Sequence, residues 1–113
     1  MTVQKASVGA LFCLVAISAG LSGAVYAADE IEGKKTYEAH CAACHGSDGF
    51  SIMPDAPNFA RSEQLLRPDS FVRDAIKEGG GAMPAYQGIL TDQQILDVIA
   101  YMRTLIISAS ILP

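Results

Sequence analysis

The chain has 113 residues, half of them hydrophobic, and a formal net charge of −4 at neutral pH. This is the length of a single domain. Twelve acidic residues against eight basic ones leave no cluster of Lys and Arg that could neutralise a nucleic-acid backbone. Nucleic acid is therefore excluded as a partner, and an acidic surface that docks on basic proteins is favoured.

The amino end, residues 1–27, has the pattern of a secretory signal peptide. Lys5 supplies a positive charge, an uncharged and mostly apolar run covers residues 6–25, and Ala27 is a small residue that suits signal peptidase. An uncleaved anchor helix is the alternative, because the run is nearly long enough to span a bilayer, but its glycines and serines favour cleavage. Cleavage would change the net charge from −4 to −5. We expect an exported, periplasmic domain over residues 28–113 that is not a stable membrane protein.

Good helix formers over residues 29–43 predict a first helix, which leads into the sequence CAACH. Cys41, Cys44 and His45 stand within five residues there, a grouping used by disulfide redox pairs, zinc sites and haem attachment sites. A redox pair of the thioredoxin kind needs a strand–helix–strand pattern, which is absent here. A structural zinc ion needs four protein ligands, and His40 is the only other candidate after cleavage.

Covalent haem attachment is the use of CxxCH that suits an exported chain. Cys41 and Cys44 would bind the two vinyl groups, and His45 would be the proximal ligand of the iron. The identity of the second axial ligand then decides whether the iron carries electrons or binds substrates.

Three methionines compete for that second position once the leader is removed. Met102 falls on the apolar face of a predicted helix and is assigned to the core. Met53 and Met83 each precede a proline, but Met53 stands only eight residues past His45, too near to reach the opposite face of a haem. Met83 follows three glycines in a loop that can approach the ring, and we predict it as the second ligand.

The middle of the chain alternates loop and helix. Residues 46–60 are dense in Gly, Pro, Asp and Ser and predict a loop wrapped around an object, and residues 61–66 allow a short helical stretch. Pro68 opens a helix that Gly79 ends. One apolar face of this helix consists of Phe71, Val72, Ala75 and Ile76.

The last predicted helix has the clearest pattern. Thr91 and Gln94 form a capping box, and an apolar face follows at helical spacing. That face consists of Ile95, Val98, Ile99, Met102 and Leu105. The tail from Ile106 to Pro113 is almost wholly apolar and too short to span a membrane; it either packs on the body or contacts another subunit.

Taken in order, these residues resemble the small bacterial class I c-type cytochromes over about residues 32–105. Gly33 and Tyr37 resemble the family's first helix, whose glycine lets the last helix cross closely. Tyr101 and Met102 resemble the aromatic-bearing stretch of that last helix. One departure is that the chain continues beyond the point where the family's last helix usually ends.

Two loops extend the resemblance. Residues 56–59 are similar to the loop in which a proline-region carbonyl accepts the ring proton of the proximal histidine, so Pro57 would orient His45. Residues 79–86 are similar to the loop that carries the methionine ligand, which places that role on Met83.

The resemblance implies an all-α cytochrome c fold, with three to four short helices wrapped around one covalently attached haem c whose iron is held by His45 and Met83. It implies a monomeric one-electron carrier, not an enzyme, that shuttles between a donor dehydrogenase or reductase and an acceptor oxidase or reductase. Two alternatives stay open. A haem enzyme or gas sensor would need a vacant iron position, and a haem-bearing subunit of a larger dehydrogenase or oxidase complex would suit the apolar tail.

Overall fold

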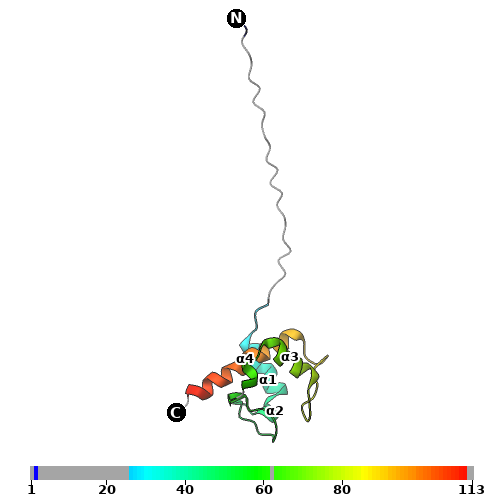
Figure 1. Ribbon diagram of the computed structural model, residues 1–113, viewed down its shortest axis with the longest axis vertical. Helices are drawn as coiled ribbons and strands as arrows, with labels where there is room; N and C mark the ends of the chain where they lie inside the picture. The colour runs from blue at the N-terminus through cyan, green and yellow to red at the C-terminus, as the bar shows by residue number, and fades with distance from the viewer. Residues whose placement is uncertain (1, 3–25, 62, 112–113) are drawn as a thin grey trace.

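The computed structural model describes residues 2, 26–61 and 63–111, so nearly all of the predicted leader lies outside the described residues. Figure 1 shows a helical body, and within the described ranges there are isolated bridges but no strand. The predicted all-α class is confirmed. The elements are α1 (Glu30–His40), α2 (Ala42–His45), the 3-10 helices η1 (Phe59–Arg61) and η2 (Glu63–Leu66), α3 (Asp69–Glu78) and α4 (Asp92–Ile111).

Helices α1 and α4 cross in close contact at the centre of the body (Figure 1). A Cβ added to Gly33 of α1 would lie 1.9 Å from the backbone oxygen of Asp97 in α4, so only glycine fits at this crossing. One turn further along, the rings of Tyr37 and Tyr101 meet edge to face, with centroids 5.3 Å apart. The close crossing that the resemblance implied is present.

The start of α1 is fastened to α4 through a buried carboxylate. The side chain of Asp29 caps α1 by accepting hydrogen bonds from the first-turn N–H groups of Ile31 and Glu32, which is why the helix begins one residue later than predicted. The N–H of Asp29 donates to Asp97 at 2.8 Å, and the amide of Gln93 donates to the same oxygen at 2.8 Å. Both hydrogen bonds satisfy the carboxylate of Asp97, a residue that is only 6% exposed.

The predicted first helix is interrupted at Cys41. Helix α1 ends at His40, and α2 resumes at Ala42, because Cys41 has φ −118° and departs from regular helical geometry. Its N–H still donates to the carbonyl of Tyr37 at 2.8 Å. The break separates the CAACH segment (residues 41–45) from α1.

Helix α3 has the predicted ends, with Pro68 before its first residue and Gly79 after its last. Val72 and Ile76 are buried as predicted, whereas Phe71 remains 41% exposed. Phe71 is not part of the hydrophobic core of the protein; its side chain lines a cavity that is described below.

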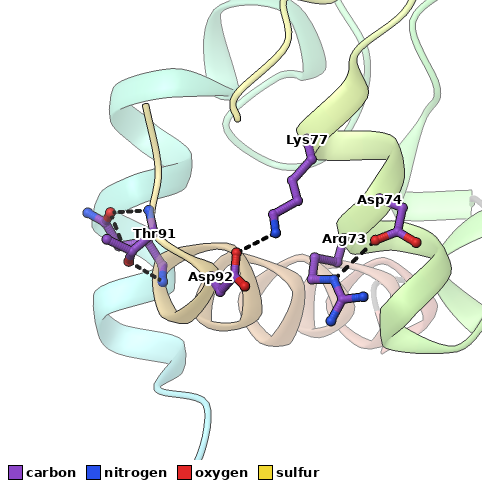
Figure 2. A network of polar contacts seen from close by, with 6 residues as sticks. Arg73, Asp74, Lys77, Thr91 and Asp92 are labelled. Carbon is purple, nitrogen blue, oxygen red and sulfur yellow. Dashed lines mark hydrogen bonds and ion pairs between the residues drawn. The ribbon is translucent and has the colours of Figure 1, made fainter. Parts of the chain in front are cut away.

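Helix α4 begins with the predicted capping box, drawn in Figure 2. The N–H of Thr91 donates to the side-chain oxygen of Gln94 at 2.9 Å, and the N–H of Gln94 donates back to the Thr91 hydroxyl at 3.2 Å. Lys77 at the end of α3 pairs with Asp92 at 2.6 Å, and this contact holds the pKa of Asp92 below its usual value. Lys77 is half-buried and Asp92 is exposed, so the pair is largely solvent-screened and stabilises little, but it joins the two ends of the segment between α3 and α4.

The apolar tail is part of α4, which runs on to Ile111. By length and composition alone α4 could cross a membrane, but one face of it is buried against the body. That face carries Ile95, Asp97, Val98, Ile99, Met102 and Leu105. The helix is therefore the core helix of this fold, and only its last turns, with Ile107 and Ile111 exposed, extend away from the body (Figure 1).

Candidate haem site

The CAACH segment presents its three reactive side chains at one end of α1. Cys41 and Cys44 are free, half-buried thiols, and His45 is 6% exposed. Burial raises the pKa of the Cys41 thiol to about 11, the opposite of the lowered thiol pKa on which a disulfide redox pair depends. The redox-pair alternative is disfavoured on this ground.

A zinc site is not assembled either. No group of three or more His, Cys, Asp and Glu side chains gathers at metal-binding distance within the described ranges, whereas a structural zinc needs four ligands. His40 lies at the surface, with its ring edge toward Tyr86 at a centroid distance of 5.8 Å.

The ring of His45 is held by two contacts. Its Nδ1 lies 3.0 Å from the carbonyl oxygen of Pro57, and its face stacks on Phe59, with centroids 4.2 Å apart and planes 14° from parallel. A carbonyl can only accept a hydrogen bond, so Nδ1 carries the proton and Nε2 keeps a free lone pair. The ring is thereby prepared to offer Nε2 to a metal.

The backbone that follows His45 is fixed from α1. The hydroxyl of Tyr37, a fully buried residue, donates to the carbonyl of Gly46 at 2.6 Å. Burial raises the pKa of Tyr37 well above its ordinary value, which keeps the hydroxyl a proton donor. The carbonyl of Cys44 accepts from the N–H groups of Ile52 and Met53, so the next loop folds back beneath the CAACH segment.

Met83 is presented by the segment between α3 and α4, residues 79–91, which we call the Met83 loop. Gly80 and Met83 exchange two backbone hydrogen bonds of 3.0 Å and close a tight turn. Gly79 makes this turn feasible, because it has φ +65° and a Cβ there would lie 2.7 Å from the oxygen of Met83. The side chain of Met83 is half-buried and packs against the core.

A cavity of about 350 Å³ lies between the CAACH segment and the Met83 loop, within the range of roughly 300–1,000 Å³ typical of cofactor sites. It adjoins a second cavity of about 250 Å³ that shares His45, Pro57 and Met83. The lining is mostly apolar, and it includes both cysteines. Met53 also lines the first cavity, and Met102 lines both while being 2% exposed in the core.

These residues fit a covalently attached haem. Two thiols, an imidazole with its Nε2 lone pair free and a thioether border one apolar cavity, and these are the donor types that bind the edge and the iron of a c-type haem. The structure thus brings together every site residue expected from the sequence: Cys41, Cys44, His45, Pro57 and Met83.

Sequence reasoning assigned no part to two aromatic residues here. Phe59, which stacks on His45, and Tyr86, whose hydroxyl donates to the carbonyl of His40 at 2.8 Å, both line the first cavity. In the sequence, only the positions of these two residues could have indicated a role. Each stands two residues after a proline, in a loop that is expected to contact the haem.

Comparison with known proteins gives consistent relatives. The family model described as cytochrome c oxidase, cbb3-type, subunit III, matches residues 28–102. A cytochrome c6 of Thermosynechococcus vestitus is 36% identical over 104 residues, which cover 88% of this chain and 91% of that protein. A cytochrome c6 of Tetradesmus obliquus is 44% identical over 80 residues, which cover 66% of this chain and 89% of that protein.

The fold has a solved counterpart. The crystal structure of cytochrome c6 from the diatom Phaeodactylum tricornutum aligns with a TM-score of 0.60 at 28% identity, covering 72% of this chain and 98% of that one. Both the sequence matches and the structural match therefore extend over most of the folded domain. The chain belongs to the small class I monohaem c-type cytochromes, which carry one covalently bound haem c.

Proposed function

We propose that this protein is a periplasmic carrier of single electrons whose haem is held by Cys41, Cys44, His45 and Met83. It is a carrier and not an enzyme. One observation supports this more than any other: His45, with its ring orientation fixed, and Met83 border the same apolar cavity as the two thiols of CAACH. Two protein ligands would leave the iron no vacant position, which disfavours a haem enzyme or a gas sensor.

Each residue has a distinct task in this proposal. Cys41 and Cys44 would form thioethers to the porphyrin edge, and His45 Nε2 and the Met83 sulfur would hold the iron. When bound, the haem supplies a one-electron ferric–ferrous couple. The Pro57 carbonyl keeps the proton on Nδ1 of His45, which orients the ring and raises its basicity toward the metal.

The apolar lining tunes the site. A thioether ligand and burial both favour the ferrous state over the ferric one, compared with ligation by two histidines. Stacking on Phe59 restrains the His45 ring from turning, so this ligand would keep its orientation in both oxidation states. The cost of reorganisation on electron transfer is correspondingly low.

Export and processing complete the proposal. Residues 1–27 act as a signal peptide that is cleaved near Ala27, and residues 28–113 form the haem domain. The periplasm supplies the setting in which a CxxCH chain of this kind operates, and the mature chain is not a stable membrane protein.

Electrons would cross on the side of the cavity that the two thiols and the Met83 loop border. Gly80 and Gly81 of that loop are exposed and line the cavity. Because the mature chain has a net charge of −5, the partners present basic surfaces and electrostatic attraction accelerates the encounter. These partners are a donor dehydrogenase or reductase and an acceptor oxidase or reductase.

A monomeric carrier is favoured over a subunit of a larger complex. The family model is named after an oxidase subunit, but it matches a domain, whereas the cytochrome c6 relative is matched over 91% of its own length. All of the proposed haem-binding residues come from one chain.

A visible spectrum of the purified, matured protein tests the ligand set. We expect a sharp alpha band in the reduced state and, in the ferric state, a weak red band from sulfur-to-iron charge transfer. Carbon monoxide should not bind the reduced protein quickly, because Met83 already occupies the position. A colourless product, or rapid carbon monoxide binding with no red band, would contradict the proposal.

Charge reversal tests the place of electron entry. Glu78 is exposed and directly precedes Gly79 and Gly80, which line the cavity. At low ionic strength, Glu78→Lys should slow oxidation by a cationic cobalt(III) complex about two- to fourfold and accelerate oxidation by ferricyanide. Glu30→Lys makes the same change in charge at the start of α1, roughly 15 Å along that helix from the CAACH segment, and should alter both rates less. Equal effects of the two variants would place the entry point elsewhere.

A further inference from the structure

The Met83 loop is attached to α3 by its backbone. The N–H of Tyr86 donates to the carbonyl of Ile76 at 3.1 Å, and the N–H of Gln87 donates to Lys77 at 3.2 Å. The side chain of Lys77 pairs with the first residue of α4, as Figure 2 shows. These bonds fix the second half of the loop relative to α3 and the start of α4, but none of them reaches the CAACH segment.

The CAACH segment is fixed on its own side of the cavity. Apart from bonds within the segment, the hydrogen bonds that the structure shows for its backbone and for His45 go to α1 or to residues 46–57. These hydrogen bonds of the CAACH segment and those of the Met83 loop are therefore separate sets. Across the part of the chain that the structure describes, a single hydrogen bond runs from the Met83 loop to the CAACH side of the cavity: the Tyr86 hydroxyl donates at 2.8 Å to the carbonyl of His40, the residue of α1 directly before CAACH.

The surroundings of Tyr86 keep this bond in place. The side chain is 8% exposed, and its ring meets the His40 imidazole nearly at right angles. Burial raises the pKa of the Tyr86 hydroxyl, so it remains a protonated donor at neutral pH. Tyr86 also lines the first cavity together with Met83, three residues before it in the loop.

We propose that the Tyr86 hydroxyl is a clasp that holds the Met83 loop closed against the CAACH segment, and that Tyr86 is thereby a positioning residue for Met83. The inference rests on the proposed role of Met83 as an iron ligand. If the loop swung outward, the Met83 sulfur would leave the iron and an outside ligand could bind. Where that motion carries Tyr86 away from α1, the hydrogen bond to His40 must break, because His40 belongs to the opposite wall.

Tyr86→Phe tests the clasp by removing one oxygen atom and keeping the ring. The full chain is matured with its haem, and the ferric protein is mixed with saturating cyanide, so that the observed rate reports departure of Met83. We expect this rate to rise about threefold to tenfold, the factor that one neutral hydrogen bond implies. The red charge-transfer band should persist in the variant, because Met83 remains the ligand at equilibrium.

Two variants serve as controls. Tyr101→Phe removes a hydroxyl that makes no hydrogen bond to the described residues, and it should leave the cyanide rate unchanged. Ile95→Val removes a methylene from a fully buried core residue and lowers global stability without touching the Met83 loop's closing contact. This variant therefore distinguishes faster opening of the Met83 loop from a general loss of stability.

The outcomes are distinct. A faster cyanide rate in Tyr86→Phe alone supports the clasp. If Tyr86→Phe behaves as the wild type, or if Ile95→Val accelerates the reaction equally, the clasp is refuted while Met83 ligation stands. If the wild type itself lacks the red band and binds cyanide at once, the proposed ligand set is refuted, and the clasp with it.

Discussion

Replacing Met83 with alanine is expected to convert a closed iron site into an open one. The ferric protein should lose the red charge-transfer band and become high spin, and its reduction potential should fall by on the order of 0.1–0.3 V, part of the roughly 0.8 V that axial ligands control. Cyanide should bind about 10- to 1,000-fold faster, because an open state that is ordinarily populated at about 0.1–10% becomes the ground state. Absorption spectra, potentiometry and stopped-flow mixing measure these effects.

Met53→Ala is the matched control for this change. Met53 also precedes a proline and lines the same cavity, so it shares the local sequence and the surroundings of Met83. The variant should keep the red band and the slow cyanide reaction. The opposite pattern, with Met53→Ala opening the site and Met83→Ala leaving it closed, would reassign the sulfur ligand.

Replacing Gly33 with alanine should destabilise the protein by about 3 kcal/mol or more, since overpacking of a well-packed contact commonly costs about 1–3 kcal/mol and occasionally more. The new Cβ would lie 1.9 Å from the backbone oxygen of Asp97, and a backbone atom cannot move aside as a side chain can. Alanine gains about 1 kcal/mol in helix propensity over glycine, so a net loss must come from the crossing. Chemical denaturation of the matured protein measures the free energy of unfolding.

Lys34→Ala provides the control for Gly33→Ala on the same helix. Lys34 is exposed, and within the described residues its ion pair is with Glu38, at 3.7 Å, so its removal should change the free energy of unfolding by less than about 0.5 kcal/mol. A Gly33→Ala variant as stable as the wild type would show that α1 and α4 do not approach as closely as the structure has them.

Elements with a local signal were predictable from the sequence. The Pro68 start and Gly79 end of α3 and the Thr91 capping box of α4 depend on interactions within a few residues, and all are found where predicted. The break of α1 at Cys41 was not predictable from the sequence, because the neighbouring alanine and cysteine residues favour no particular helix end. The continuation of α4 was likewise missed, since an apolar tail carries the same residues whether it is helical or not.

The candidate site divides in the same way. CAACH is a contiguous motif, and the approach of Pro57 to His45 followed from a family loop. Tyr86 escaped notice because its partner, His40, is 46 residues away, and no periodicity in a single sequence indicates that pairing. Phe59 was missed because stacking depends on ring orientation, which only the folded loop determines.

The hydrogen bonds that build the two walls of the cavity also differ in the number of residues between their partners. His45 and Pro57 are 12 residues apart, whereas the bond between Tyr86 and His40 spans 46; loop-closure entropy makes the longer connection about 1 kcal/mol more costly. A folding chain can accordingly seat the imidazole early, from nearby residues alone. The sulfur-bearing wall arrives afterwards, once α3 and α4 have docked.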